Sequence, residues 1–535
     1  QETISPRFTY HGYRFIEITG IDKPLPVGAV KGVVLSSIHE LASRYETSNT
    51  QVNQLWKNIT WSSYGNFLSI PTDCPQRNER LGWAGDISVF SRTATYLADV
   101  PQFLRRYLRS MRDVQRTDER FPDIAPLGGG FGGLLWGSAG ITVPWECYQQ
   151  YGDTILLSEH YDAMKRYIQY IIDNTIETET NLIVQTRSWG DLCDWLGLED
   201  EKNDKSLVWE AYFIYDLELM AKMATVLGKV TDAEWFRELH AARKDFFNKT
   251  YIEPETGKTL FSAFVPEKKG SHIDIQTSYV LPLAFNIIDE ENRNKVIANL
   301  AETVRRENTT DRGQQCPSYS LMTGFIGTSW INKALSDYGH SDLAYRLLQQ
   351  TSYPSWLYSI EQGATTIWER LNSYTRTDGF GGNNRMNSFN HYSFGAVGAW
   401  MYNYSLGIQR DETFPGFKQF VLKPMPDPTG KMTYARGYYD SMYGRIESGW
   451  KVESGVIRYT FTVPANTTAT LYLPTASLRD VREKTKPVRK CKGVEFISEG
   501  NGEVVLKLLS GSYSFEVKKD YPLAARKRKK YVFVR

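Results

Sequence analysis

Two segments of the sequence place acidic side chains beside tryptophan and arginine. The first spans residues 71–86 (PTDCPQRNERLGWAGD) and carries three carboxylates, two arginines and one tryptophan. Its two prolines and two glycines do not suit a continuous helix, so we predict a loop between two helices. Loops on a rigid scaffold are where ligand-binding groups collect. The alternative interpretation is a turn in which Arg77 and Arg80 simply neutralise Asp73 and Glu79.

The second segment spans residues 361–370 (EQGATTIWER) and is followed by residues 387–392 (NSFNHY). Here Glu369 stands between a tryptophan and an arginine, far along the chain from Glu79. If the intervening helices close into a toroid, its first and last hairpins become neighbours. The loops that carry the two glutamates then face each other across one cavity.

Two carboxylates above an aromatic-lined pocket are what hydrolysis of a glycosidic bond requires. One must be protonated to protonate the departing oxygen, while the other must be ionised to activate water or attack the anomeric carbon. Aromatic residues make up 13% of the chain, and many stand beside Gly, Asp or Asn. Sugars offer apolar faces to aromatic planes and hydroxyl groups to carboxylates, although ordinary core packing explains most of these aromatic residues.

The region that must position both segments has a helical period. Behind Asn49 and Thr50, which are predicted to cap a helix, apolar residues recur at helical spacing from Val52 to Ile59, and similar stripes occupy residues 164–172 and 296–304. A capping box at 231–234 (TDAE) predicts the start of another helix. Strong strands do not alternate with these helices, which argues against Rossmann and TIM-barrel folds.

Strand-like sequence lies on both sides of this helical region. Residues 7–10, 13–18 and 30–35 are rich in β-formers, and period-2 runs occupy 456–463, 468–473 and 503–517. The sequence therefore predicts a mainly α protein, with a toroid flanked by an N-terminal β segment and a C-terminal antiparallel β-sandwich. The predicted divisions are 1–45 for the end of an N-terminal β-sandwich, 46–408 for the helical domain, 409–520 for the C-terminal sandwich and 521–535 for a basic tail.

Several classes of function are disfavoured. With 63 basic against 61 acidic residues among 535, the chain lacks the charge of an electrostatic nucleic-acid binder. No segment approaches the roughly 18–20 apolar residues of a membrane helix, so we expect a soluble protein. There is no Walker A loop, no HExxH and no paired histidine at metal spacing, so we expect neither cofactor nor metal. The glycine-rich run at 128–133 is predicted to be a loop near a cleft.

The acidic motifs carry a specific resemblance. Residues 72–86 (TDCPQRNERLGWAGD), 363–370 (GATTIWER), 353–358 (YPSWLY) and 390–392 (NHY) closely resemble signatures of bacterial α-L-rhamnosidases of glycoside hydrolase family 78. The likeness covers nearly the whole chain. It implies an (α/α)6 toroid flanked by β-sandwiches, and an enzyme that removes terminal α-L-rhamnose from oligosaccharides, polysaccharides or glycosides with inversion of configuration.

Site residues follow from this resemblance, position by position. Glu79 resembles the family's general acid and Glu369 its general base. The groups that resemble those holding the rhamnose ring are Asp73, Arg77, Trp83, Asp86, Trp136, Trp189 and His391. Trp195 is an alternative to Trp189, and a structural histidine is the alternative interpretation of His391.

The chain departs from the family pattern at Asn78, where aspartate is more common, which removes a negative charge beside Glu79. A non-catalytic rhamnose-binding remnant and another (α/α)6 glycosidase are therefore kept as alternatives. The aglycone, the linkage preference and the oligomeric state stay open. So does the compartment, which in a bacterium could be periplasmic, extracellular or cytoplasmic.

Overall fold

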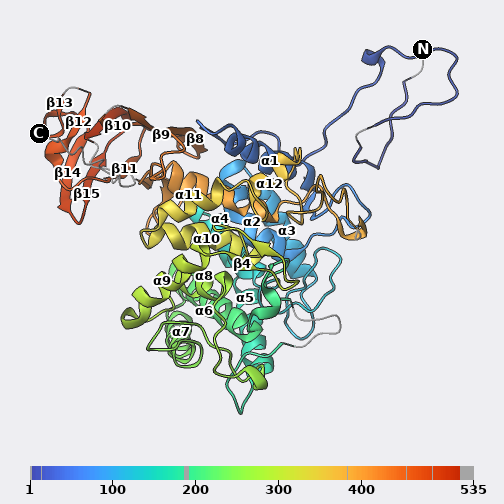
Figure 1. Cartoon of the computed structure of the whole chain (residues 1–535), viewed down its shortest axis with the longest axis horizontal. Coiled ribbons are helices and arrows are strands. Elements are labelled where there is room, and N and C mark those ends of the chain that lie inside the picture. Colours follow the sequence, from blue (N-terminus) through green and yellow to red (C-terminus); the bar gives the residue numbers. More distant parts are fainter. Residues whose placement is uncertain are drawn as a thin grey trace, which may run out of the picture.

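A ring of helices with β-sheets on one side forms the body of the molecule (Figure 1). This computed structural model describes residues 3–13, 15–185, 192–381, 384–453, 455–484 and 486–518, so the predicted tail at 521–535 lies outside them. The helices are α1 (Thr50–Asn66), α2 (Ala84–Leu97), α3 (Pro101–Asp113), α4 (Ala139–Tyr151), α5 (Thr154–Thr175), α6 (Lys205–Val226), α7 (Val230–Tyr251), α8 (Gln276–Ala284), α9 (Glu290–Arg305), α10 (Phe325–Asp337), α11 (Ser341–Leu348), α12 (Trp356–Glu361) and α13 (Gly398–Trp400).

The helices form two concentric layers. Each inner helix contacts the next in the order α2, α4, α6, α8 and α10, and the 3₁₀ turn Ser393–Val397 closes the ring by contacting both α10 and α2. The inner helices are buried nearly all round, whereas outer helices such as α7 bury one face only. This difference follows from their sequences, since a helix that is apolar on every side must be enclosed. The predicted toroid is confirmed.

Local signals located some helix ends and missed others. Asn49 caps α1 as predicted, accepting hydrogen bonds from the backbone N–H groups of Gln51 and Val52. The predicted capping box at 231–234 is wrong, because α7 already begins at Val230. The α6–α7 connection is a tight hairpin through Gly228, whose φ is +69°, so α7 begins immediately after the turn.

The predicted strands at 7–10, 13–18 and 30–35 are also wrong. Residues 3–13 and 15–42 contain a single 3₁₀ turn, Val27–Ala29, and no strand. Much of this segment extends away from the helical ring (Figure 1), and apolar side chains such as Phe8, Phe15 and Val33 are exposed. A β-prone sequence forms a strand only where a neighbouring strand pairs with it, and the described residues offer this segment no such partner.

Two sheets stand beside the ring. The strands are β1 (Ser43–Thr47), β6 (Ile408–Arg410), β7 (Gln419–Leu422), β8 (Tyr434–Ser441), β9 (Gly444–Glu453), β10 (Val456–Val463), β11 (Thr468–Leu473), β12 (Val481–Glu483), β13 (Lys486–Pro487), β14 (Val494–Gly500), β15 (Glu503–Leu508) and β16 (Gly511–Lys518). One sheet has the order β1-β8-β9-β10-β16-β12-β13 and the other β14-β15-β11-β7-β6. The period-2 runs therefore form the predicted strands, and β11 with β7 is the one parallel pair in these two sheets among the described residues.

A buried ion triad joins the ring to these sheets. Glu146 on α4 accepts hydrogen bonds from Arg92 on α2, at 2.7 Å, and from Arg410 at the end of β6, at 2.6 Å. Burial raises the pKa of Glu146, but the two guanidinium groups outweigh burial and lower it to about 2. None of the described helices is long and apolar enough to cross a membrane.

Replacing Glu146→Gln should lower the free energy of unfolding by about 3–5 kcal/mol, because two partly buried arginines lose a fully buried counter-charge. Since the folded-state pKa lies below the ordinary 4.5, the stabilisation is present above pH 4.5 and is lost as pH falls towards 2. Urea unfolding followed by circular dichroism measures both effects. Asp245→Asn, which removes the exposed pair with Lys249 on α7, is the control and should change stability by less than about 1 kcal/mol. Equal effects of the two variants would contradict the assigned role of the triad.

Candidate functional site

Helix α1 holds the two acidic segments together. At its C-terminal end, the Asn66 carbonyl accepts a hydrogen bond from the Thr72 N–H at 3.0 Å, at the start of the first segment. The Asn66 side chain donates to the Asn390 carbonyl at 3.2 Å, in the second. One residue thus fixes two chain segments that are far apart in sequence.

The middle of α1 binds the loop that leads to Glu369. The Asn58 amide donates to the Ala364 carbonyl at 3.0 Å, and the Ser62 hydroxyl accepts from the Ile367 N–H at 2.8 Å. The Glu369 N–H in turn donates to the Ser388 carbonyl at 2.9 Å. These bonds explain why residues 363–370 keep a defined path without regular secondary structure.

The first segment folds as the predicted loop. It closes on itself where the Asp73 N–H donates to the Leu81 carbonyl at 3.0 Å, and the Leu81 N–H donates back to the Asp73 carboxylate at 3.2 Å. Trp83 is the residue before α2, and Asp86 lies in that helix's first turn. A carboxylate there is favoured by the positive end of the helix dipole.

The two glutamates share one arginine. Arg77 Nη2 donates a hydrogen bond to Glu79 Oε2 and lies 3.5 Å from Glu369 Oε2. Trp83 Nε1 donates to the other oxygen of Glu79 at 3.0 Å. The Glu79 side chain is 26% exposed and that of Glu369 only 6%. The structure therefore brings Arg77, Glu79, Trp83 and Glu369 together, with one carboxylate near solvent and the other recessed.

A second charged group lies deeper in the site. His391 Nε2 is 3.1 Å from Asp86 Oδ1, which also accepts a hydrogen bond from the Ser393 hydroxyl at 2.8 Å. Burial alone lowers the pKa of His391, but the hydrogen bond and charge of Asp86, with the charges of Glu369 and Asp73, raise it to about 9. His391 is therefore a buried cation at neutral pH.

Burial has the opposite effect on the nearby carboxyl groups. It raises the pKa of Asp73 to about 7, although the charge of His391 opposes the change. Burial also raises the pKa of Glu369 above its ordinary value, against the charges of His391 and Arg77. Shifted pKa values of this kind cluster at functional sites.

Trp136 reaches the site because a glycine makes room for it. A Cβ at Gly85, in the first turn of α2, would lie 2.5 Å from the Trp136 indole. The glycine-rich loop before Trp136 is tied to buried Asp123, whose carboxylate accepts hydrogen bonds from the Phe131 and Gly132 N–H groups. Trp136 thus packs one residue away from Asp86. Trp189 lies outside the described residues.

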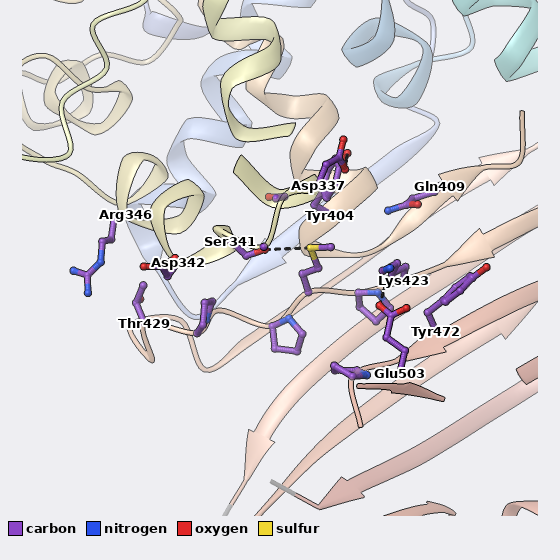
Figure 2. A pocket seen from close by; sticks show the side chains of 17 residues that line it. Asp337, Ser341, Asp342, Arg346, Tyr404, Gln409, Lys423, Thr429, Tyr472 and Glu503 are labelled. Atoms are coloured by element: carbon purple, nitrogen blue, oxygen red, sulfur yellow. Dashed lines mark hydrogen bonds and ion pairs between the residues drawn. The ribbon is translucent and has the colours of Figure 1, made fainter. Parts of the chain in front are cut away.

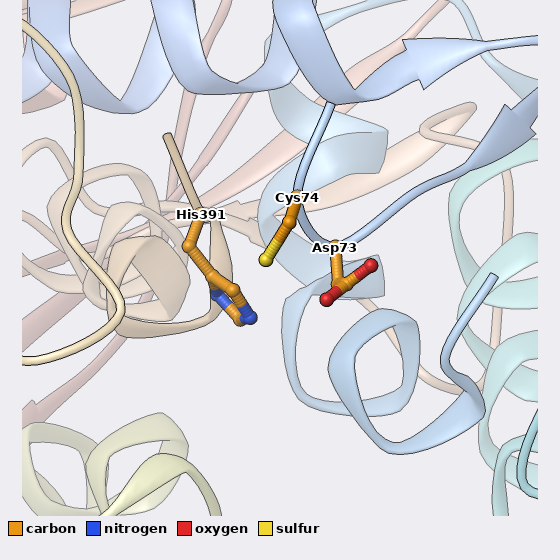
Figure 3. A group of neighbouring side chains, drawn as sticks. All are labelled: Asp73, Cys74 and His391. Carbon is orange, nitrogen blue, oxygen red and sulfur yellow. The ribbon is translucent and has the colours of Figure 1, made fainter. Parts of the chain in front are cut away.

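Asp73, Cys74 and His391 form the one group of potential metal ligands found among the described residues (Figure 3). Their ligand atoms lie within 4.8 Å of one another. Burial raises the pKa of the Cys74 thiol, and His391 is cationic, so both would have to lose a proton before binding a metal ion. The group is better suited to holding polar ligand atoms than a cation.

One sizeable cavity lies away from these residues. It measures about 780 Å³ and opens between the ring and the sheets (Figure 2), where its lining includes Tyr404, Lys423, Tyr472 and Glu503. A cavity of about 470 Å³ is closer to the acids, because Arg370 and Leu371, which follow Glu369 directly, line it. Trp195, the alternative to Trp189, also lines this second cavity.

Some residues that shape the site were not predicted. Ser393 directly follows the NHY motif and stands two residues after His391, a spacing that could have suggested a role beside that histidine. Asp123 and Asn66 gave no signal, because a buried polar residue that anchors a distant loop has no local pattern. Asn78, the departure from the family, has an exposed side chain.

Comparison with known proteins agrees with this geometry. The model of the bacterial α-L-rhamnosidase six-hairpin glycosidase domain matches residues 40–405, and that of the bacterial α-L-rhamnosidase C-terminal domain matches residues 407–487. The chain belongs to the bacterial α-L-rhamnosidase six-hairpin glycosidase family. The fold predicted from the motif resemblance is therefore confirmed.

Individual relatives match over most of the chain. An α-L-rhamnosidase of Streptomyces avermitilis is 37% identical over 97% of this chain and 46% of its own length, and one of Formosa agariphila is 34% identical over 96% and 53%. The crystal structure of the Streptomyces avermitilis α-L-rhamnosidase complexed with L-rhamnose superposes with a TM-score of 0.78 at 36% identity, covering 90% of this chain and 43% of that one. The chain spans about half the length of the curated relatives it matches.

The charge of His391 can be measured directly. In protein labelled with ¹³C-histidine, the resonance missing from His391→Gln should titrate near pH 9, because Asp86 stabilises the imidazolium. Since this pKa lies above the ordinary 6.5, the histidine stabilises the fold fully below pH 6.5, and the effect is lost as pH rises through 9. His160 is the control: its pKa is lowered by burial to about 3, so it should not titrate between pH 5 and 10. Titration of His391 at or below pH 6.5 would contradict the buried-cation assignment.

Proposed function

We propose that this protein is an inverting exo-α-L-rhamnosidase that hydrolyses terminal α-L-rhamnosyl residues of oligosaccharides, polysaccharides or glycosides. The observation that carries the proposal is the pair Glu79 and Glu369, held by one arginine in a helical ring of the rhamnosidase family. The activity that the relatives' names give and the rhamnose bound to the Streptomyces avermitilis structure support the choice of sugar.

Glu79 is the general acid in this proposal and Glu369 the general base. The more exposed carboxyl group is suited to reach the departing oxygen, which leads to the rest of the substrate. The recessed carboxylate is suited to hold a water against the anomeric carbon. Arg77 and His391 both favour the ionised form of Glu369, which a base needs.

Inversion needs room for a water between the two carboxyl groups, which stand about 6.5–9.5 Å apart in inverting glycosidases. Arg77 Nη2 contacts both carboxylates, so it must withdraw when sugar and water enter. The same guanidinium also donates to the Arg385 carbonyl at 2.9 Å, on the segment that follows Glu369.

The other predicted residues would hold the sugar. Asp73 and Asp86 can accept hydrogen bonds from ring hydroxyls, and His391 holds the Asp86 carboxylate in place. Trp83 and Trp136 offer apolar faces to the ring and to the methyl group of a 6-deoxy sugar. Such a methyl contact adds only about 1–3 kcal/mol of selectivity, so the polar groups must supply the rest.

The first test follows hydrolysis of p-nitrophenyl α-L-rhamnopyranoside by NMR. Inversion predicts that β-rhamnose appears first and then mutarotates. Initial α-rhamnose would overturn the inverting mechanism. A folded wild type that binds rhamnose in calorimetry but releases no product would overturn the enzyme proposal in favour of a binding protein.

The two carboxylate roles can then be separated by leaving group. Glu369→Gln should lower kcat by about 10²–10⁴-fold on every substrate, because the water loses its base. Glu79→Gln should cause a similar loss with alkyl rhamnosides and little loss with 2,4-dinitrophenyl rhamnoside, whose phenolate departs without a proton. Exposed Glu234→Gln on α7 is the control and should leave all rates unchanged. Equal sensitivity of both variants to the leaving group would contradict the assignment.

A further inference from the structure

The segment that precedes the helical ring lies against the loop that carries Glu79. Arg80, the next residue after Glu79, donates from Nη2 to the Tyr10 carbonyl at 3.1 Å. Its guanidinium carbon also lies 4.3 Å from the centre of the Tyr10 ring. A residue 70 positions upstream thus contacts the immediate neighbour of the proposed acid through both its backbone and its ring.

Arg80 also fixes the shape of the loop itself. Its φ is +50°, a left-handed conformation that a non-glycine residue adopts only when its surroundings hold it there. Its Nε donates to the Pro75 carbonyl at 3.0 Å, and its backbone N–H to the Cys74 carbonyl at 3.3 Å. The Arg80 side chain therefore folds back towards Pro75 across the loop, and the Tyr10 ring packs on its guanidinium group.

A second contact lies beside the first. A Cβ at Gly12 would stand 2.7 Å from the Gln76 Cβ, so the two backbones approach as closely as a glycine allows. The Gln76 side chain in turn donates to the Ser388 hydroxyl at 2.8 Å, and the carbonyl of Ser388 accepts the hydrogen bond from the Glu369 N–H. Residues 10–12 thus contact the loop that carries Glu79 (residues 71–86, the acid loop) at two residues, Gln76 and Arg80, which lie on either side of Arg77 in the sequence.

We propose that Tyr10 is a positioning residue for the general acid, acting through Arg80. The proposal rests on the function proposed above. Glu79 is partly exposed, and among the described residues its carboxyl group hydrogen-bonds to Arg77 and Trp83 of its own loop, Arg77 also lying close to Glu369. The position of the Glu79 backbone therefore depends on the contacts that fix the neighbouring Arg80. Tyr10 supplies those contacts that come from outside the helical ring.

The test compares leaving groups in the full chain. Tyr10→Ala should lower kcat/KM for methyl α-L-rhamnoside and rhamnose-terminated disaccharides by on the order of tenfold, because a misplaced acid protonates them poorly. It should change the rate with 2,4-dinitrophenyl rhamnoside less than about twofold, since that substrate needs no acid. Tyr10→Phe should match the wild type, because the contact uses the ring and the carbonyl, not the hydroxyl.

Tyr13→Ala is the matched control. Tyr13 belongs to the same segment, is 55% exposed, and has its hydroxyl beside Gly32 instead of the acid loop. Wild-type dependence on the leaving group in Tyr10→Ala, or an equal loss on all substrates, would overturn the proposal. A wild type that hydrolyses no rhamnoside would overturn the proposed function instead, so the two failures are distinguishable.

Discussion

The site depends on one face of α1 supplying hydrogen bonds to chain segments that have no regular structure. Asn58, Ser62 and Asn66 recur every four residues and so share one side of the helix. Together they pair with backbone groups of both acidic loops. Buried backbone groups must be satisfied, and the bonds within each loop leave others, such as the Ile367 N–H and the Ala364 carbonyl, for the side chains of α1. This polar stripe of Asn58, Ser62 and Asn66 therefore allows two loops from opposite ends of the helical region to meet.

Charge balance is the second constraint. Asp73, Asp86 and Glu369 are all buried within a small volume, which is unfavourable for three like charges. The protein offsets this with His391 inside the group and Arg77 at its edge. The balance leaves Asp73 and Glu369 with raised pKa values. Burial itself is the main cause of both shifts, and the two cations oppose it only in part.

The sequence was informative where a signal is local, and where a long motif matched a family. The Asn49 cap, the loop at 71–86 and the approach of Glu79 to Glu369 were all predicted from these signals. The strands at 7–10, 13–18 and 30–35 failed because strand formation depends on a partner that composition cannot reveal. The anchoring roles of Asn66 and Asp123, and the contact of Tyr10 with Arg80, join residues too distant for any pattern to connect.

The sheets are joined to the ring where the chain enters and leaves it. Ser43 and Tyr45 of β1 hydrogen-bond to Tyr402 and Ser405, so the chain enters and leaves the ring at one place. Strand β1 also pairs with β8, and α1 begins three residues after β1 ends. Because α1 carries the stripe that holds both loops, its position is set by the sheet at one end and by the loops at the other. The ring and the sheet domain therefore act as one unit in holding the two carboxylates, even though no residue of β8–β16 is among those that form the site.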